Sequence, residues 1–363
     1  MMNKLKRVVK SCVKQLDDAY YHSVIKRAEY VKIEERKASW EQVSLTKEQI
    51  EEINAVYGFK VDTRWHRYFQ YYTGKFDAQY LPDNIFALSM EGKMNPRKIA
   101  SELEDKIRLP ILYSTVPGLV LPKTVVSNAS GIYYDGNYNV ISKAEADAIV
   151  KQFLEENFEA IKKPTRDSGG GEGIQMLCRD TFEALSFDEN FIVQERIVNQ
   201  EDIRTLNPSS LNTMRVITYI CDNQYFCAPL AMRMGCGTSR LDNITSGGIC
   251  IGVMENGELC DHAYTEFRVD KYAEHPSTGV KFEGYRIRNV DKVINAAIEC
   301  HKRTPHMIMA SWDFTLNENG QPVLIEVNLT GQSVCFPQYT HGRSLFGENT
   351  AKMLEIRNKK GYL

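Results

Sequence analysis

The pattern of apolar and polar positions changes from a helical period to a strand period near residue 103. In the first stretch, apolar side chains recur at helical spacing among basic residues. These apolar residues are Leu5, Val8, Val9, Cys12, Val13 and Leu16. Residues 45–56 predict a second helix, with Thr46 and Gln49 as its capping box. Residues 1–104 contain no catalytic motif, and we expect a mainly helical, substrate-side region there.

From residue 105, short apolar or β-branched runs alternate with turn residues. The Asp-Gly pair within residues 131–140 predicts a hairpin. Ser142 and Glu145 predict a capped helix that continues to about residue 156. Further strands are expected at residues 158–163, 174–177 and 191–198. Strand, hairpin and helix in this order predict an α+β fold.

The rest of the chain is richer in predicted strands. They are expected at residues 216–221, 226–234, 249–253 and 258–264, and a helix is expected at residues 290–300. Near the end, an Asn-Gly pair lies between two apolar runs, residues 312–316 and 323–327. An Asn-Gly pair between strand-like runs is among the strongest short-range signals for a hairpin.

The composition is that of an ordinary globular protein, with 43% hydrophobic and 25% charged residues. A length of 363 residues favours two or three subdomains. The 45 basic and 47 acidic residues nearly cancel, so the charge gives no signature of nucleic-acid binding. Nine cysteines without a C-x-x-C pair favour reduced thiols in a cytoplasmic protein. No apolar run approaches the ~20 residues of a membrane span, and no signal peptide is recognisable.

The basic stretch at the N-terminus has two interpretations. Its helix could lie on the inner face of a membrane, where lysine and arginine attract anionic lipids. A solvated helix that docks on its own domain is the more frequent origin of this pattern, and the apolar face is small and lacks Trp or Phe. Peripheral membrane contact is therefore one partner hypothesis, and the oligomeric state stays open.

The predicted C-terminal hairpin carries the first candidate chemistry. Because side chains alternate along a strand, Asp313 lies on one face of the first strand, and Glu326 and Asn328 share a face of the second. Two carboxylates and an amide oxygen suit Mg²⁺, which leaves other positions to water and phosphates. A solvated hairpin that happens to carry acids is the alternative.

A glycine-rich segment, TRDSGGGEGI, follows the strand at residues 158–163, with Lys162 and Lys163 before it. Glycines allow backbone N–H groups to approach a polyphosphate closely. The segment is neither a Walker A loop, which needs Gly-Lys-Ser/Thr, nor a dinucleotide fingerprint, which needs a helix to follow. A flexible surface loop would produce the same composition.

Arg215 and Arg233 are expected to point inward from central strands, toward either a phosphate or a local acid. The polar loop of residues 235–248 is of the kind that closes over substrates, and Asp242 and Asn243 are its chief functional candidates together with Gly247 and Gly248. The histidines at 262, 275, 301 and 306 show no metal-binding spacing.

In this order the motifs resemble the ATP-grasp superfamily of carboxylate–amine ligases over about residues 105–350. The matching features are Asp105-Lys106, the Lys163-Pro164 pair before SGGGEGI, FIVQERI, the two arginines and the Asp313…Glu326-x-Asn328 spacing. The segments NPSSLNTMR and DNITSGG look like the sugar-transfer-associated group of bacterial polysaccharide biosynthesis. The resemblance implies an ATP-grasp fold with an N-terminal extension (1–104), an N-terminal lobe (105–200) and a C-terminal lobe with the metal site (201–363).

The resemblance also implies a nucleotide site made of phosphate-binding lysines, a covering loop, an adenine hinge and a ribose carboxylate. These residues are Lys106 and Lys163; Ser168, Gly169, Gly170 and Gly171; Gln194, Glu195, Arg196 and Ile197; and Glu201 or Asp202. The spacing does not choose between the two acids, and the doubled lysine at Lys162 leaves the phosphate ligand ambiguous.

For catalysis, the resemblance implies that Arg215 or Arg233 binds the γ-phosphate and acyl-phosphate oxygens, with Asn243 on the covering loop. Asp313, Glu326 and Asn328 would hold one or two Mg²⁺ ions, with Mn²⁺ as a substitute.

The expected activity is an ATP- and Mg²⁺-dependent carboxylate–amine ligase that acts through an acyl phosphate. Its partners would be ATP, a small-molecule carboxylate and an amine, such as an amino acid and a uronic acid or other sugar derivative. A kinase that phosphorylates a sugar or small-molecule hydroxyl is the alternative, because the same fold and ligands serve both reactions. A non-enzymatic nucleotide-binding scaffold is the third hypothesis.

Overall fold

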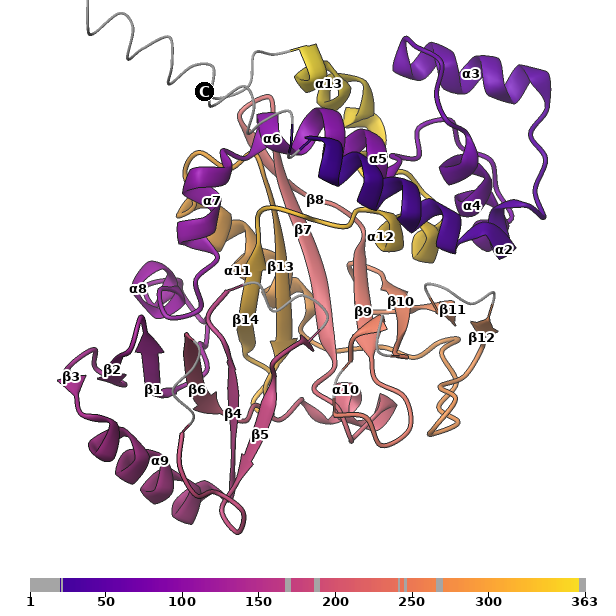
Figure 1. Cartoon of the computed structure of the whole chain (residues 1–363). Coiled ribbons are helices and arrows are strands. Elements are labelled where there is room, and N and C mark those ends of the chain that lie inside the picture. The colour runs from indigo at the N-terminus through magenta and orange to yellow at the C-terminus, as the bar shows by residue number, and fades with distance from the viewer. Residues whose placement is uncertain are drawn as a thin grey trace, which may run out of the picture. The chain divides into compact units, whose positions relative to one another are not determined.

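The computed structural model describes residues 20, 22–166, 171–185, 190–240, 242–244, 247–265 and 270–358 (Figure 1). The chain divides into two compact units. One contains Met1–Met94, Phe267–Val269 and Gly331–Leu363, and the other contains Asn95–Glu266 and Asp270–Thr330. The three-part division at residues 104 and 200 stays a prediction, and most of the basic N-terminal stretch lies outside the described residues.

The first unit is helical in its described part. A helix over residues 22–35 precedes α2 (Lys37–Trp40), α3 (Lys47–Tyr57), α4 (Arg64–Thr73), α5 (Asp83–Ile85), the π-helix η1 (Phe86–Met90) and α6 (Glu91–Met94). After residue 330 come α12 (Cys335–His341), η4 (Gly347–Asn349), α13 (Thr350–Leu354) and η5 (Glu355–Asn358). The predicted capping box of Thr46 and Gln49 is present at the start of α3. The rings of Tyr72 and Tyr339 stack with centroids 5.0 Å apart, which joins α4 to α12 within an aromatic core.

The second unit begins with α7 (Arg97–Leu103) and α8 (Leu109–Tyr113) and continues into an antiparallel sheet. Its strands, counted over the described residues, are β1 (Thr124–Ala129), β2 (Ile132–Asp135), β3 (Val140–Ile141), β4 (Glu159–Pro164), β5 (Gln175–Cys178) and β6 (Phe191–Glu195), in the order β3-β2-β1-β6-β4-β5. The helix α9 (Lys143–Asn157) begins with the predicted Ser142–Glu145 capping box and packs on this sheet through a small apolar core.

A larger antiparallel sheet follows the short helix α10 (Glu201–Leu206). Its described strands are β7 (Thr213–Cys221), β8 (Gln224–Cys227), β9 (Leu230–Met234), β10 (Ile249–Val253), β11 (Leu259–Tyr264), β12 (Lys271–Tyr272), β13 (Met309–Leu316) and β14 (Pro322–Asn328). The order is β12-β11-β10-β9-β7-β13-β14, and β8 pairs with β7. The helix α11 (Val290–Lys302) packs against β7 and β13.

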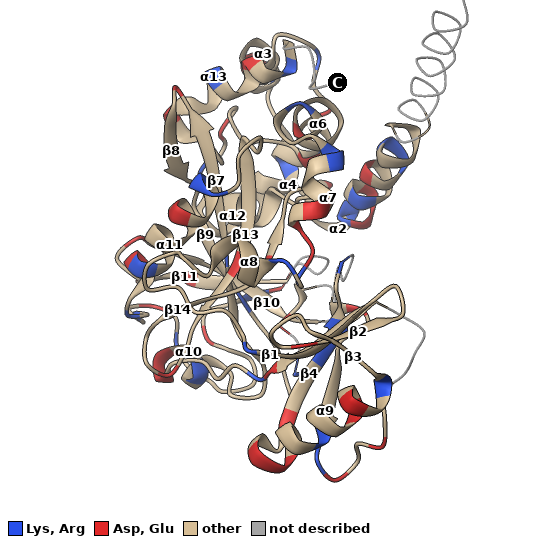
Figure 2. Ribbon diagram, turned by 90° about the vertical axis from the view of Figure 1, so that its left-hand side faces the viewer, with Lys and Arg blue, Asp and Glu red and all other residues tan. Residues whose placement is uncertain are grey.

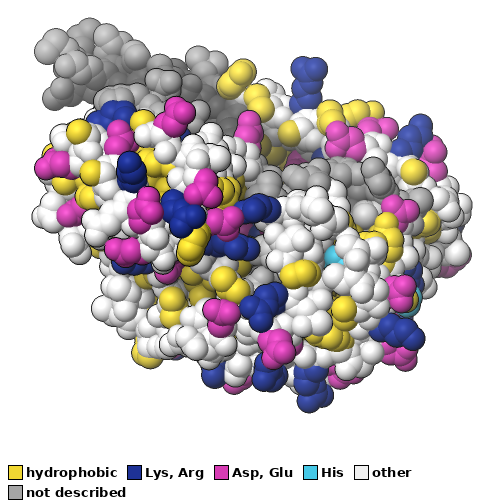
Figure 3. Space-filling view, turned by 90° about the horizontal axis from the view of Figure 1, so that it is seen from below, with side chains coloured by type: hydrophobic (Ala, Val, Ile, Leu, Met, Phe, Trp, Pro, Cys, Tyr) yellow, Lys and Arg dark blue, Asp and Glu magenta, His cyan; other side chains and the backbone are white. Residues whose placement is uncertain are grey.

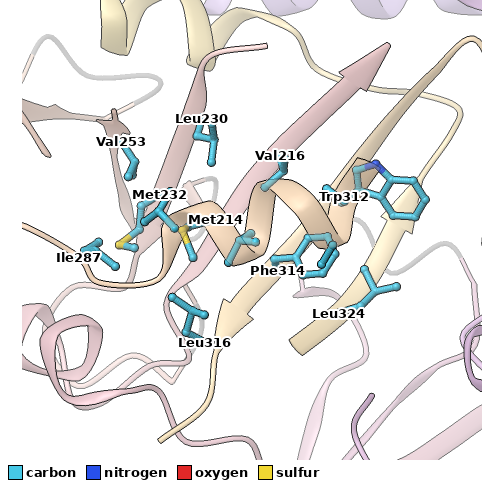
Figure 4. Packing of buried hydrophobic residues seen from close by; sticks show 14 of the residues in the cluster. Met214, Val216, Leu230, Met232, Val253, Ile287, Trp312, Phe314, Leu316 and Leu324 are labelled. Atoms are coloured by element: carbon cyan, nitrogen blue, oxygen red, sulfur yellow. The ribbon is translucent and has the colours of Figure 1, made fainter. Parts of the chain in front are cut away.

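The two faces of this sheet have opposite character because alternate residues of each strand point in opposite directions. Figure 4 shows Met214, Val216, Met232, Trp312 and Phe314 within one buried apolar cluster. The intervening positions of the same strands include the charged residues Arg215, Arg233 and Asp313. The apolar face therefore fixes the strands, and the other face carries the candidate chemistry.

The helix and sheet content confirms the α+β prediction, and the hairpin of β13 and β14 is confirmed. The strand expected at residues 191–198 ends at Glu195, and Glu201 and Asp202 open the helix α10, which the sequence did not predict. Over the described ranges, no helix is both long enough and apolar enough to cross a bilayer.

Candidate functional site

The hairpin of β13 and β14 brings the three predicted metal ligands together. Asp313 pairs directly across the strands with Glu326, and Ser311 pairs with Asn328. The Asn328 Nδ2 atom lies 3.4 Å from Asp313 Oδ2, so the amide and the carboxylate are in contact. Asp313 is almost fully buried, whereas Glu326 and Asn328 are half-buried. The period-two alternation of the sequence was sufficient to predict this cluster.

Both predicted arginines contact Asp313. Arg215 Nε donates to Asp313 Oδ1 at 2.6 Å, and Arg233 Nη2 lies 3.1 Å from Oδ2. Burial alone would raise the pKa of Asp313, but the two guanidinium groups outweigh it and hold that pKa well below its ordinary value. Burial opposes the charge of Arg233 too, yet the carboxylates of Asp313 and Asp242 raise the pKa of Arg233. The free protein thus holds an ionised carboxylate between two cations.

Two buried lysines from different segments lie beside this cluster. Lys106 Nζ is 3.1 Å from Glu326 Oε2, and the Lys106 N–H donates to the Thr165 carbonyl at 2.9 Å, next to the end of β4. Lys163 lies on β4 and is also buried. Burial, and next the charge of Lys106, lower the pKa of Lys163 to about 8. Two ammonium groups forced together in a buried place favour an anion between them.

Lys162 and Lys163 are consecutive on β4 and point in opposite directions. Lys162 Nζ lies 4.8 Å from the ring centroid of Phe191, and Phe191 belongs to the core under α9. The ammonium group of Lys163 interacts electrostatically with Lys106 and with the carboxylate of Glu326. Lys163 therefore has Glu326 as an electrostatic neighbour, and Lys162 lies over Phe191.

The glycine loop can be described in part. Ser168, Gly169 and Gly170 lie outside the described residues. Gly171 has φ 78° and Gly173 φ 74°, both in the left-handed region, and a Cβ atom on Gly173 would lie 2.7 Å from Pro164 Cγ. Glycine is thus required where the chain passes the end of β4.

The predicted hinge residues lie at the end of β6, where each has a local partner. Gln194 is buried, and its Nε2 lies 3.3 Å from the Pro122 carbonyl. Glu195 Oε1 accepts the Lys123 N–H at 2.8 Å, and Arg196 Nη1 donates to Glu159 Oε2 at 2.9 Å. Ile197 follows and is half-buried. These contacts fix the backbone of the segment.

The two acids at the start of α10 differ in their surroundings. Asp202 Oδ2 accepts both the N–H and the Nε of Arg288 at 3.0 Å, and the Asp202 carbonyl accepts the Tyr285 hydroxyl. Glu201 is exposed. Asp202 is therefore engaged by the chain itself, and Glu201 presents its carboxylate to solvent.

The loop after β9 is anchored to the first residue of β7. Asp242 Oδ2 accepts the Thr213 N–H at 3.0 Å and the Thr213 hydroxyl proton. Asn243 contributes its carbonyl, which accepts the Gly248 N–H at 3.0 Å. A Cβ atom on Gly248 would lie within 2.7–2.8 Å of the carbonyl oxygens of Asp242, Asn243 and Met234. The structure places Asp242 beside Arg233, with Oδ2 3.9 Å from Arg233 Nε, and the backbone of Asn243 takes part in this anchor.

Glu104, which the sequence analysis did not single out, stabilises the end of β14, the strand that carries the candidate ligands Glu326 and Asn328. Glu104 Oε1 accepts the backbone N–H groups of Leu329 and Thr330 at 2.6 and 2.8 Å, directly after Asn328. Glu104 is separated from Leu329 by 225 positions, and no local pattern marks it. The sequence alone therefore carried no signal for this contact.

The side chains present fit a Mg²⁺ ion. Within the described ranges no three His, Cys, Asp or Glu side chains form a metal-binding group. Asp313, Glu326 and the amide oxygen of Asn328 nevertheless provide three hard oxygen donors on adjacent strands. Mg²⁺ commonly takes one or two carboxylates and completes its octahedron with water and phosphate oxygens.

The charges around this site are distributed on several elements. Figure 2 shows a basic segment on β4, the strand that carries Lys162 and Lys163. In the space-filling view of Figure 3, basic and acidic side chains are interspersed on the visible face. The surface seen there agrees with a formal net charge of −2, because no single sign dominates it.

The family described as sugar-transfer associated ATP-grasp matches residues 86–353. No curated protein matches the chain.

Solved structures with a similar course of the chain include ligases and a carboxylase. The VanG D-Ala:D-Ser ligase from Enterococcus faecalis has 17% identity and a TM-score of 0.40 over 72% of this chain and 62% of that one. D-alanyl-alanine synthetase A from Vibrio cholerae has 13% identity and a TM-score of 0.41 over 72% and 66%. Biotin carboxylase from Campylobacter jejuni has 14% identity and a TM-score of 0.42 over 72% and 47%. The chain thus spans less than two thirds of each of these proteins.

Proposed function

Because the chain belongs to the sugar-transfer associated ATP-grasp family, we propose that it is an ATP-dependent carboxylate–amine ligase acting through an acyl phosphate. One observation carries the proposal. Four buried or half-buried cations, Lys106, Lys163, Arg215 and Arg233, converge on the hard-oxygen cluster of Asp313 and Glu326. A polyphosphate that arrives with a divalent cation supplies the charges that this arrangement requires.

In the first half-reaction, a substrate carboxylate attacks the γ-phosphoryl group in line, and ADP leaves. Lys106 and Lys163 would hold phosphate oxygens, and Arg215 and Arg233 would neutralise the charge that develops on the transferred group. Asp313, Glu326 and Asn328 would hold Mg²⁺, which when bound neutralises phosphate charge as a Lewis acid. The loop of Ser168, Gly169, Gly170 and Gly171 would cover the phosphates.

The nucleoside would lie against the end of β6, with the backbone of Gln194 to Ile197 toward the adenine. Glu201 is the better candidate for the ribose hydroxyls, because its carboxylate is exposed, whereas Asp202 is bonded to Arg288 through Oδ2 and its Oδ1 is buried. The ribose role of Glu201 is tested by Glu201→Gln, which should raise the KM for ATP more than that for a 2′,3′-dideoxy analogue.

In the second half-reaction, an amine attacks the acyl phosphate, and the tetrahedral oxyanion needs a preorganised cation or N–H donor. Arg233 and the backbone of the loop that contains Asn243 and Gly248 are the candidates. An acyl phosphate exposed to water would be hydrolysed, so cover by this loop would protect it. On the support of the family's association with sugar transfer, we propose a carboxylated sugar and an amino acid or amine as substrates, in a cytoplasmic step of cell-surface polysaccharide biosynthesis.

The test is incubation with ATP, Mg²⁺, a panel of uronic acids and other small carboxylates, and hydroxylamine, which traps acyl phosphates as hydroxamates. We expect hydroxamate and free phosphate in equal amounts, and neither product from Asp313→Asn. A phosphorylated sugar without free phosphate would identify the kinase alternative instead. Absence of hydroxamate across the whole panel would refute the ligase.

We also propose peripheral membrane contact by the N-terminal helix. In the described part, Tyr20, Val24 and Val31 are exposed by 74%, 46% and 46%, on the face opposite the buried Ile33 and Arg36. Their spacing extends the apolar pattern of residues 5–16, whose flanks are basic and attract anionic lipids. Co-sedimentation with phosphatidylglycerol vesicles, and not with phosphatidylcholine vesicles, is the expected result. Equal recovery in the supernatant with both would refute it.

A further inference from the structure

The structure assigns a positioning role to Thr213 and Asp242: we infer that the Thr213 hydroxyl, oriented by Asp242, sets the place of the Arg233 guanidinium opposite the phosphoryl group. The inference rests on the proposed function, because the phosphoryl group is the ligand that Arg233 would meet. Neither Thr213 nor Asp242 contacts the substrate in this assignment, and both act through Arg233.

The hydrogen-bond directions around Thr213 are determined by its neighbours. The Thr213 hydroxyl donates its proton to Asp242 Oδ2, which also accepts the Thr213 N–H. The lone pairs of the same oxygen then face Arg233, whose Nη2 donates at 2.8 Å and whose Nε lies 3.3 Å away. Thr213 and Arg233 are also direct cross-strand partners on β7 and β9. The hydroxyl therefore holds the guanidinium from β7, the strand that lies between β9 and the hairpin.

Arg233 is shared between this neutral acceptor and a charged one. Its Nη2 also lies 3.1 Å from Asp313 Oδ2, the atom that approaches Asn328. A guanidinium has five N–H donors, so Arg233 can exchange Asp313 for a phosphate oxygen while it keeps its bond to Thr213. Without the hydroxyl, the nearest acceptors left to Arg233 are Asp313 and Asp242, and the guanidinium would compete with the metal for Asp313.

The anchor is built into the loop after β9. Asp242 receives two donors from Thr213, its N–H and its hydroxyl, so the loop and β7 are joined at this residue. The backbone of Gly248 passes so close to the Asp242 carbonyl that only glycine fits. Asp242 thus connects the loop to Arg233 through the Thr213 hydroxyl.

The experiment compares Thr213→Val, which removes the hydroxyl at nearly constant shape, with Thr213→Ser, which keeps it. The control is Thr340→Val in the other unit, which deletes a buried hydroxyl that donates only to backbone carbonyls. Two quantities are measured: Mn²⁺·ATP affinity by electron paramagnetic resonance, and kcat and KM for carboxylate-dependent ADP formation. Mn²⁺ binding is a readout that does not require turnover.

We expect Thr213→Val to weaken Mn²⁺·ATP binding and to lower kcat, each by about tenfold, the effect of one lost hydrogen bond to a charged group. Thr213→Ser should restore both, and Thr340→Val should change neither. The inference is overturned if the wild type is active and Thr213→Val has the same Mn²⁺·ATP affinity and the same kcat. It is also overturned if Thr213→Ser is as impaired as Thr213→Val. If the wild type binds Mn²⁺·ATP but forms no hydroxamate, the proposed ligase fails, and the Mn²⁺·ATP affinities alone decide the positioning role. A wild type without Mn²⁺·ATP binding would overturn both.

Discussion

Lys163 provides a proton-linked test of the nucleotide site. Burial and the neighbouring Lys106 lower its pKa to about 8 in the free protein. At about pH 8.5, half a unit above that value, about three quarters of Lys163 is neutral. A phosphate oxygen in contact with Lys163 favours the charged form and raises the pKa again. Binding of ATP should therefore take up about 0.7 proton per molecule at this pH.

The proton uptake can be measured by isothermal titration calorimetry at about pH 8.5 in two buffers with different ionisation enthalpies. The observed binding enthalpy changes between the buffers in proportion to the number of protons taken up. Lys163→Met should abolish this dependence and weaken ATP binding. Lys162→Met is the matched control, because the neighbouring side chain lies over Phe191 on the other face of β4, and it should retain the uptake.

Release of protons by the wild type, or equal uptake by wild type and Lys163→Met, would refute the placement of Lys163 at the phosphates. The free protein gives an independent check. The folded pKa of about 8 is below the ordinary value of 10.5, so between these values the unfolded chain binds more protons and the free energy of unfolding rises with pH. In the wild type, the free energy of unfolding, measured by chemical denaturation, should rise by about 3 kcal/mol over this pH range, or by less if water reaches the Lys163 ammonium. Lys163→Met should lack this rise.

Three further outcomes are expected. Gly248→Ala should impair Mn²⁺·ATP binding, because the added Cβ would meet three carbonyl oxygens. Gly237→Ala, in the same loop, has open space around its Cβ and should cost only about 1 kcal/mol of backbone strain, measured by thermal unfolding. Burial lowers the pKa of His301 to about 4, so as the pH falls this histidine is protonated in the unfolded chain before it is protonated in the folded one. The free energy of unfolding should therefore fall by about 3 kcal/mol from pH 6.5 to pH 4. His301→Gln should flatten this pH dependence in denaturation curves. Glu104→Gln should lose about 1–2 kcal/mol in the same assay and weaken Mn²⁺ binding, because its carboxylate holds the two N–H groups after Asn328.

The local patterns in the sequence were sufficient to predict the hairpin and the proximity of its three candidate metal ligands. The turn residues fix the pairing of β13 with β14, and the period of two places Asp313 opposite Glu326. The same alternation separates Lys162 from Lys163, but it does not say which of them faces the site. That choice depends on Phe191, which lies on another strand and packs under α9. The alternation of side chains along a strand is a local property. Which of the two faces meets the site depends on the tertiary packing of other strands and helices.

Long-range partners were beyond the sequence. Arg215 was expected to meet either a phosphate or an acid, and in the free protein its partner is Asp313, 98 positions away. The ribose acid could not be chosen from spacing, because the discriminating neighbour, Arg288, follows Asp202 by 86 positions. Such pairs depend on the order of strands and on loop paths, and no residue near either partner indicates them.

The ion pairs of the free protein determine how metal and nucleotide can enter. Asp313 is buried between Arg215 and Arg233, and removing one partner from a buried pair is costly because a charge is left uncompensated. A metal ion alone would take Asp313 away from both arginines, and a nucleotide alone would add negative charge beside Asp313. Together they exchange arginine–carboxylate contacts for arginine–phosphate and carboxylate–metal contacts, so each charge keeps a partner. Under the proposed function, metal and ATP should therefore bind with strong mutual dependence, and the neutral amide introduced by Asp313→Asn should remove that dependence along with the metal ligand.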